Sequence, residues 1–220
     1  MDKLLKLKYL YKLKEAGVEY FEGFESKDEN IKMPNELEEL KKICQKCTLC
    51  NLSKTRTNVV FGEGDPNAKL MFIGEGPGEM EDKTARPFVG RAGKLLTKII
   101  ENVLELDRSK VYIANIVKCR PPNNRVPTIE EAESCKPYLL KQIEIINPKI
   151  LVCLGKTAFM YLLNSDMPIS KVRGQLFEFK GKKVIPTYHP SFLLRNPSAK
   201  KEAYKDFLFI KKLLEETWKN

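Results

Sequence analysis

Short apolar runs alternate with segments of helical periodicity along most of this chain. An apolar run of about four to eight residues bounded by turn residues is typical of a buried strand. Such runs predict three strands and a hairpin-like pair leading to a fourth main strand: 68–73, 111–117, 148–154, and 175–179 with 183–187. The fourth main strand is expected to end at Tyr188-His189-Pro190-Ser191.

Helical spacing dominates the stretches between these strands. Apolar side chains recur every three or four residues between 93 and 106, which predicts a helix after the first strand. Thr128 and Glu131 form a capping box for a later helix, which Pro137 is expected to kink or divide. A final helix, capped by Ser198, is expected to present one apolar face: Ala203, Phe207, Ile210, Leu214 and Trp218.

The N-terminal part of the chain has a different pattern. Lysines and leucines between residues 2 and 16 predict a basic amphipathic helix, and a mixed acidic linker follows. Docking on the rest of the protein is the simpler role for this helix, and contact with a membrane or DNA is the alternative. A short helix then opens at Pro34, with Asn35 as N-cap and these side chains directed to the core: Leu37, Leu40 and Ile43. We therefore divide the chain into a segment, 1–35, and a domain, 36–220.

The alternation of strands and helices predicts the fold class. It is typical of an α/β protein whose parallel sheet is covered by helices on both faces. In such a sheet, ligands bind beyond the carboxyl ends of the strands. The loops after the first, second and fourth strands are therefore expected to converge at one rim.

The 220 residues carry a net charge of +10, with 42% hydrophobic and 31% charged residues. This length and mixture fit one soluble domain with an appendage. Clustered lysines and arginines bind phosphates by releasing counterions, so a polyanionic partner is one interpretation and a solvated basic surface is the other. The sequence has no apolar run of about 18 residues and no signal-peptide pattern, and we expect a cytoplasmic protein.

Six cysteines indicate metal binding more than disulfide bonds in such a protein. Cys44 and Cys47 supply two thiols from one turn, and Cys119 and Cys135 can supply two more. This set suits a four-thiolate zinc or iron–sulfur site. Cys50 extends the first pair toward a ferredoxin run, but the next position of that run is not a cysteine, which argues against a two-cluster ferredoxin.

The stretch from Gly74 to Gly93 becomes acidic and glycine-rich where the first strand ends. Its glycines permit a ligand to approach the backbone closely. Neither this stretch nor Gly155-Lys156-Thr157 has the glycine spacing of a dinucleotide or P-loop motif, and the acidic side chains would repel phosphate. Asn115 and the single histidine, His189, follow two other strands, so both are expected at the same rim.

In combination, these motifs resemble the family 4 uracil-DNA glycosylases, the iron–sulfur branch of the uracil-glycosylase superfamily. The resemblance covers the chain from about Ile43 onward and rests on Cys44-x2-Cys47, GEGPGE with the following ED and RPFVG, ANIVKCRPP, Cys119-x15-Cys135 and HPSFLLRNP. Ala85 departs from the family pattern, which has glycine before RPFVG.

The resemblance implies a three-layer α/β/α sandwich with a central, mainly parallel four-stranded sheet. It implies a [4Fe–4S] cluster on four cysteines: Cys44, Cys47, Cys119 and Cys135. It also implies a DNA repair enzyme that flips deoxyuridine out of single- or double-stranded DNA and hydrolyses its N-glycosidic bond. We expect a monomer without a membrane partner.

Roles for single residues follow from the same resemblance. Phe88 would stack on uracil, and the Asn115 amide would pair with O4 and N3–H and so reject cytosine. Gly76 would let a backbone N–H approach O2. His189 would donate to O2 as negative charge develops on the leaving base.

The carboxylate that activates water stays open between Glu75 and Glu81. We expect a joint role, with Glu81 as an alternative support for Asn115 and His189. The resemblance also implies that the 192–195 segment enters the minor groove as an apolar wedge. The side chains expected to contact DNA are Arg86, Ser191, Leu193 and Arg195. Further candidates for phosphate contact are Lys83, Arg91, Arg120 and Arg125.

Two other function classes compete with the enzyme. A non-catalytic nucleic-acid-binding module could keep the same fold, stabilised by a cluster or zinc. An electron-transfer protein could use the cysteines, but it would leave the glutamate, asparagine and histidine side chains without a purpose.

Overall fold

Six strands form one sheet in the order β1-β3-β2-β4-β6-β5. The four central strands are parallel, while β1 and β5 pair antiparallel at the two edges. Their bounds are β1 Glu63–Gly64, β2 Leu70–Gly74, β3 Tyr112–Asn115, β4 Ile150–Leu154, β5 Phe177–Phe179 and β6 Lys182–Thr187. The predicted parallel core of four strands and the β5–β6 hairpin are confirmed. The two-residue strand β1 was not predicted, because so short a segment has no periodicity.

The computed structural model describes residues 33–218, and the expected basic helix and linker before them lie outside the described residues. The helices are α2 Leu37–Gln45, α3 Glu79–Thr84, α4 Arg91–Asn102, α5 Ile129–Ile146, α6 Lys156–Leu163, α7 Ile169–Val172, α8 Pro190–Arg195 and α9 Lys200–Trp218. Short 3-10 turns are η1 Asn51–Lys54, η2 Arg108–Lys110, η3 Pro122–Asn124 and η4 Pro197–Ala199. None of the described helices combines the length and apolarity needed to cross a membrane.

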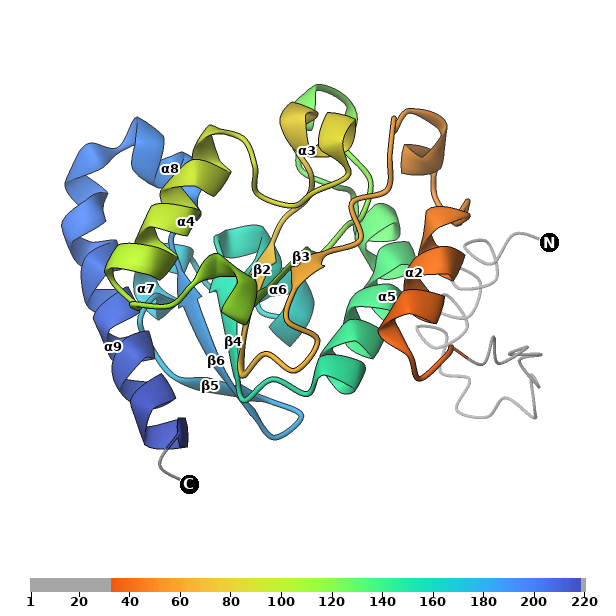
Figure 1. Ribbon diagram of the computed structural model, residues 1–220. Coiled ribbons are helices and arrows are strands. Elements are labelled where there is room, and N and C mark those ends of the chain that lie inside the picture. The colour runs from red at the N-terminus through yellow and green to blue at the C-terminus, as the bar shows by residue number, and fades with distance from the viewer. Residues whose placement is uncertain (1–32, 219–220) are drawn as a thin grey trace, which may run out of the picture. The chain divides into compact units, whose positions relative to one another are not determined.

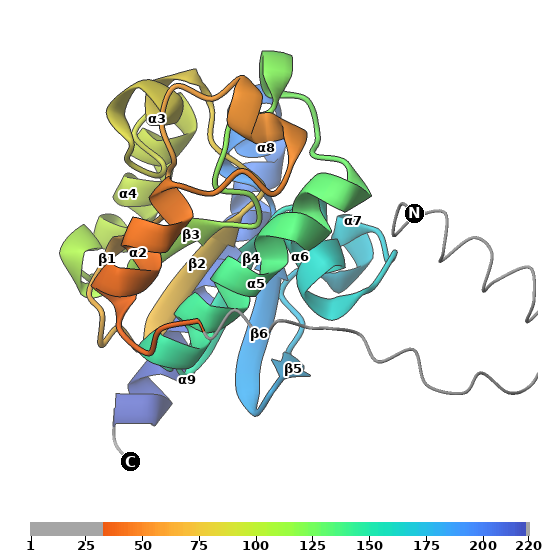
Figure 2. The ribbon, with the colours of Figure 1, turned by 90° about the vertical axis from the view of Figure 1, so that its right-hand side faces the viewer.

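Helices cover both faces of the sheet, with α4, α8 and α9 on one face and α2, α5 and α6 on the other (Figures 1 and 2). Strand side chains alternate between the two layers: Leu70 and Phe72 belong to the core cluster under α4 and α9, whereas Met71 and Ile73 are buried outside that cluster. The apolar face of α9 is confirmed at Ala203, Phe207, Ile210 and Leu214. The side chain of Trp218 lies outside the described residues.

The start of α2 differs from the sequence prediction. Asn35 is not its N-cap, because α2 begins two residues later, and Asn35 Oδ1 instead accepts from Lys141 Nζ at 2.7 Å. Ile43 is 40% exposed, so its expected place in the core is also wrong. Residues four apart lie on the same face of a helix, so Cys44 is buried on the same face of α2 as Leu40.

The expected division of one helix at Pro137 and the expected cap of the last helix at Ser198 are both wrong, whereas a kink at Pro137 stays a prediction. α5 has the predicted capping box of Thr128 and Glu131, but it continues without a break through Pro137. Pro137 is exposed, so water can reach the carbonyl that loses its N–H partner. Ser198 lies inside η4 and does not cap α9, which begins at Lys200.

A buried ionic contact fixes the end of β6, where the chain enters the His189 segment. Asp206 of α9 accepts from Thr187 Oγ1 at 2.7 Å and from Arg173 Nε at 3.0 Å. Asp206 is 3% exposed, so its charge depends on these donors. The contact ties the last helix to the strand end that precedes His189.

Candidate active site and cysteine pocket

A cleft of about 810 Å³ opens at the carboxyl ends of the central strands. The loops after β2, β3, β4 and β6 form its walls, which is the position expected for a ligand site in such a sheet. Sequence-predicted residues that line it are Glu75, Gly76, Glu81, Phe88, Asn115, His189, Ser191 and Arg195. The expected convergence of three strand-end loops at one rim is therefore observed, and the β4–α6 loop joins them.

Glu75 follows β2 directly and is anchored at two points. Its backbone carbonyl accepts from the Val117 N–H at 3.2 Å, which extends the pairing of β2 with β3. Its Oε2 accepts from Thr157 Oγ1 at 2.5 Å. Among the described residues, no donor bonds to the other carboxylate oxygen, Oε1. Glu75 therefore has one oxygen that can accept from a molecule in the cleft.

Phe88 forms an aromatic wall of the cleft and is 6% exposed. Its φ of 51° is in the left-handed region, which is uncommon for a bulky residue and marks a constrained loop. Glycines make room for it, because a Cβ on Gly74 would lie 2.6 Å from Phe88 Cζ and one on Gly93 would lie 1.9 Å from its carbonyl oxygen. The Phe88 and His189 rings lie 5.6 Å apart at 37°, so the two rings border the same space.

Asn115 is the last residue of β3 and is 1% exposed. Its Oδ1 is the one buried side-chain nitrogen or oxygen of the described residues that lacks a hydrogen-bond partner. A buried acceptor without a donor costs roughly 1 to 3 kcal/mol, so such atoms are rare unless a ligand supplies the donor. Because Asn115 lines the cleft, its amide can recognise a polar ligand there.

His189 caps α8, and this cap determines which ring nitrogen carries hydrogen. The Ser191 backbone N–H donates to His189 Nδ1 at 3.1 Å, so Nδ1 is an acceptor and the neutral ring carries its hydrogen on Nε2. Burial lowers the pKa of His189 to about 4, with Arg195 adding to the effect and Glu81 opposing it. At neutral pH, His189 is therefore an uncharged donor through Nε2–H.

Glu81 supports the Phe88 loop. Its Oε1 accepts from the N–H groups of Val89 and Gly90, each at 2.8 Å, just before α4 begins. A carboxylate at this position also complements the positive end of the helix. Within the described part of the chain, Glu81 makes no hydrogen bond to Asn115 or His189, so the expected direct support of those two residues is not observed.

One residue expected to contact DNA lies in the core. Leu193 is 1% exposed and packs in the cluster under α4 and α9, so it cannot act as an exposed wedge. The helical turn of α8 directs it inward, and Phe192 lines the cleft instead, with its ring 4.8 Å from that of Tyr188. Leu194 is partly exposed beside them. Of the two leucines of α8, Leu193 is therefore the one that packs in the core.

Arg86 lies apart from the cleft lining. Its guanidinium donates to both carboxylate oxygens of Glu63, at 2.6 and 2.9 Å. This contact lowers the pKa of Glu63 and neutralises the charge that was expected to contact DNA. Lys83 is similarly paired with Glu79 at 2.6 Å.

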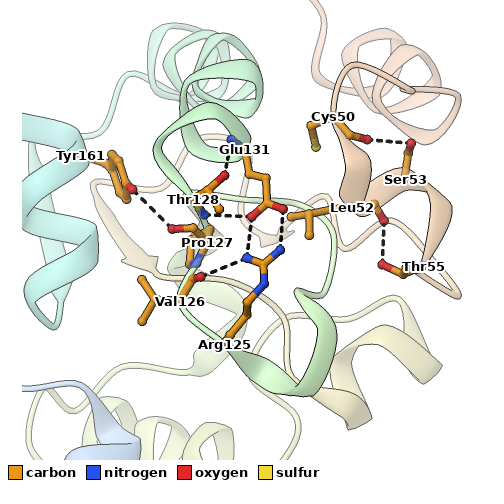
Figure 3. A network of polar contacts seen from close by, with 10 residues as sticks. All are labelled: Cys50, Leu52, Ser53, Thr55, Arg125, Val126, Pro127, Thr128, Glu131 and Tyr161. Atoms are coloured by element: carbon orange, nitrogen blue, oxygen red, sulfur yellow. Dashed lines mark hydrogen bonds and ion pairs between the residues drawn. The ribbon is translucent and has the colours of Figure 1, made fainter.

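Arg125 also has an acidic partner, in the loop between β3 and α5 that forms one wall of the cleft. Its guanidinium donates to both oxygens of Glu131, at 2.7 and 2.8 Å, and Glu131 accepts from the Thr128 N–H at 2.8 Å (Figure 3). Tyr161 on α6 donates to the Pro127 carbonyl at 3.4 Å. These contacts hold the wall in place.

The four cysteines expected to bind a cluster line a second pocket together with a fifth thiol: Cys44, Cys47, Cys50, Cys119 and Cys135. Burial raises the pKa of both Cys44 and Cys135 to about 12, so their thiols stay protonated at neutral pH unless a cation stabilises the thiolates. Two positive groups are already present, since Arg56 Nη1 donates to Cys119 Sγ at 3.2 Å and Lys118 lines the pocket.

Lys118 connects this pocket to the cleft. It is 1% exposed, and burial lowers its pKa to about 8, with the neighbouring thiols opposing the effect. Its Nζ donates to the Asn115 carbonyl at 2.9 Å and to Gln142 Oε1 at 2.6 Å. Its backbone N–H donates to Cys135 Sγ at 3.3 Å. The end of β3 therefore contacts both sites.

Among the described residues, no three histidine, cysteine, aspartate or glutamate side chains are grouped to hold one metal ion. The thiols line a pocket between α2, the Lys118–Cys119 turn and α5.

Comparison with known proteins decides the family. Residues 61–211 match the model of the Uracil DNA glycosylase superfamily. A type-4 uracil-DNA glycosylase of Thermotoga maritima is 56% identical over 156 residues, 70% of this chain and 81% of its own length. Relatives of the same name from Sulfurisphaera tokodaii and Saccharolobus solfataricus are 49% and 48% identical, over 80% and 77% of this chain and 84% and 82% of their own lengths.

This chain belongs to the type-4 uracil-DNA glycosylase family. The superfamily match covers the cleft and the second cysteine pair, whereas Cys44 and Cys47 precede it. The family resemblance predicted from the motifs is therefore confirmed, while the roles of single residues are not tested by the comparisons.

Three side chains of this type-4 family member have contacts that its sequence did not predict. Thr157 was considered only as part of a P-loop, and Lys118 only as part of a loop. Asp82, 3% exposed, accepts from the backbone N–H groups of Thr57 and Asn58 at 3.0 and 3.2 Å. A buried charged residue indicates a structural or functional contact, but a single sequence does not show which residues are buried.

Proposed function

We propose that this protein is a DNA repair enzyme that hydrolyses the N-glycosidic bond of deoxyuridine in DNA. The products are free uracil and an abasic site. Its family supports the reaction, and the observation that carries the proposal is the unpartnered Asn115 Oδ1 in a cleft bordered by Phe88 and His189. A duplex hides the base edge that Asn115 would read, so the deoxyuridine must be flipped into the cleft.

The Asn115 amide accounts for base selection. Its Oδ1 would accept from uracil N3–H, and its Nδ2 would donate to O4. Cytosine has an acceptor at N3 and a donor at position 4, so it would leave Oδ1 unpaired and oppose two donors. A site built to bond such groups rejects the wrong partner strongly. Phe88 would stack on the base.

His189 would stabilise the leaving base. As the bond between C1′ and N1 breaks, its electron pair moves onto uracil, and O2 becomes more negative. The Nε2–H of neutral His189 would donate to this oxygen, with a backbone N–H near Gly76 as a second donor. Removing one such donor typically costs about 3 kcal/mol of transition-state stabilisation.

Glu75 is the proposed general base. It would accept a proton from the water whose oxygen bonds to C1′ as uracil leaves. The support comes from its free Oε1 in the cleft and from the different position of Glu81, whose Oε1 bonds to two backbone N–H groups. We therefore refine the expected joint role: Glu75 activates water, and Glu81 holds the Phe88 loop.

The rim of the cleft would contact the DNA. Ser191 and Arg195 line it on α8, and Lys156 lines it on α6, so hydroxyl, guanidinium and ammonium groups are available to phosphates. Phe192 and Leu194, and not Leu193, are the proposed apolar wedge. A DNA substrate also favours the expected cytoplasmic location, and the monomeric state and the boundary at residue 35 stay predictions.

Four cysteines, Cys44, Cys47, Cys119 and Cys135, are proposed to hold a [4Fe–4S] cluster. Their thiols line one pocket beside Lys118 and Arg56, whose charges would offset the thiolates. The cluster would stabilise the loops at the end of β3. Iron and sulfide analysis with visible absorbance tests this, and zinc without sulfide would contradict it.

The enzymatic proposal is tested with purified protein and matched oligonucleotides that contain one uracil, thymine or cytosine at the same position. Alkali cleaves abasic sites, so a shortened strand reports base release. We expect cleavage of the uracil strand alone. Full-length uracil strand, at a protein concentration shown to bind the same DNA, would instead favour the non-catalytic nucleic-acid-binding module.

A further inference from the structure

The glutamate proposed as general base is held by a threonine from another part of the chain. Thr157 Oγ1 donates to Glu75 Oε2 at 2.5 Å across 82 positions of sequence. Thr157 is the second residue of α6, so the carboxylate also lies beside the positive end of that helix. Both residues line the cleft.

We infer that Thr157 is a positioning residue for base release, which holds Glu75 so that its other oxygen, Oε1, meets the attacking water. This inference rests on the proposed function. A glutamate side chain has three rotatable bonds, and a general base must lie within hydrogen-bond reach of the proton that it accepts. The contact from Thr157 fixes one carboxylate oxygen, while the pairing of the Glu75 backbone with Val117 fixes the other end.

The turn that carries Thr157 is itself fixed against the other proposed catalytic group. Gly155 precedes α6 with a φ of 90°, and its N–H donates to the Thr187 carbonyl at 2.8 Å. A Cβ on Gly155 would lie 3.0 Å from His189 Cβ. The Gly155-Lys156-Thr157 turn therefore contacts both Glu75 and the His189 segment.

The alternative is that this hydrogen bond only joins β2 to α6 and stabilises the fold. The two roles predict different effects when the Thr157 hydroxyl is removed. A purely structural contact affects the melting temperature and is independent of the Glu75 carboxylate. A positioning contact affects the chemical step, and its effect disappears once Glu75 cannot act as a base.

A double-mutant cycle tests the inference with full-length protein and the uracil oligonucleotide under single-turnover conditions. The variants are Thr157→Val, which removes the hydroxyl at nearly constant shape, Thr157→Ser, which keeps it, Glu75→Gln and Thr157→Val/Glu75→Gln. Thr217→Val is the matched control, because it removes a hydroxyl that donates to the Leu213 carbonyl within α9. Thr157→Ala replaces Thr157→Val if the latter does not fold.

We expect Thr157→Val to lower the maximal rate by about tenfold to a hundredfold, with little change in the protein concentration that gives half-maximal rate. Thr157→Ser and Thr217→Val should stay near the wild-type rate, and Thr157→Val should slow Glu75→Gln no further. A wild-type rate for Thr157→Val or for Glu75→Gln, or additive losses in the double variant, would overturn the inference. A wild-type protein that releases no uracil would instead overturn the proposed function itself.

Discussion

At the scale of single residues, Asn115 is the clearest case of a side chain kept for a ligand. Its Oδ1 is buried without a partner, which destabilises the ligand-free protein. Replacement by leucine removes this cost and keeps the branching and the number of side-chain heavy atoms. We therefore expect Asn115→Leu to raise the free energy of unfolding by about 1 kcal/mol, measured by urea denaturation. Asn67→Ala, at an exposed turn, is the control and should change it little. A loss of stability in Asn115→Leu would indicate that Oδ1 has a partner in the protein.

The neutral state of His189 predicts a dependence of stability on pH. Its pKa is about 4 in the folded protein and about 6.5 in an unfolded chain. Between these values the unfolded chain binds more protons, so stability is lost as pH falls from about 6.5 to about 4. His189→Gln should lose this component, so its stability should decline less steeply than that of the wild type in urea titrations over this range. Parallel curves would show that His189 titrates normally.

Sequence patterns predicted the site at this scale because strand ends are easy to recognise. Phe88, Asn115 and His189 follow apolar runs, and the topology brings them into one cleft. The direction of a side chain on a short helical turn is harder to predict, which is why Leu193 was placed on the surface. The pairing of Arg86 with Glu63 was not predicted for another reason, since the two residues are distant in sequence.

At the scale of elements, the turn after α3 carries local strain. Ala85 ends this helix with φ 57° and ψ 19°, a left-handed conformation that suits glycine. Ala85→Gly should therefore stabilise the protein by about 1 kcal/mol in thermal or urea unfolding, without a change in base release. Asn164→Gly, at the left-handed end of α6, is the control and should gain less, because asparagine tolerates this conformation. If Asn164→Gly gained as much stability as Ala85→Gly, or if Ala85→Gly lost stability, strain at Ala85 would not be the explanation.

The end of β3 depends on a buried lysine that joins two sites. Lys118→Met would leave the Asn115 carbonyl and Gln142 Oε1 without their donor. We expect a loss of about 3 kcal/mol in the free energy of unfolding, whereas Lys149→Met, at an exposed position, should be nearly neutral. Similar stability in the two variants would show that neither acceptor needs Lys118.

Most elements were predictable because periodicity reports burial on one face. The parallel core, the capping box at Thr128 and the apolar face of α9 all follow from it. The errors lie at helix ends and at Pro137, where one hydrogen bond or one exposed carbonyl decides the outcome. Those contacts depend on neighbours that are far away in the sequence, such as Lys141 beside Asn35.

At the scale of the whole molecule, the net charge of +10 has to be weighed by position. Arg195 is exposed at the rim of the cleft, whereas Arg86 is paired with Glu63. We expect Arg195→Ala to reduce the slope of log affinity for DNA against log salt by about 1, the value for one phosphate contact. Arg86→Ala should change the slope less. Fluorescence anisotropy over a salt series measures both, and an equal change would show that pairing with Glu63 does not matter.

We propose that Asn115 recognises a flipped uracil in the strand-end cleft so that the glycosidic bond of the nucleotide is hydrolysed. The most direct test is the single-turnover rate of uracil release from one oligonucleotide by the wild type, Asn115→Leu and Asn67→Ala. We expect uracil release by the wild type and Asn67→Ala, and a rate lower by about 10² to 10³ for folded Asn115→Leu. Equal release by Asn115→Leu and the wild type would contradict it.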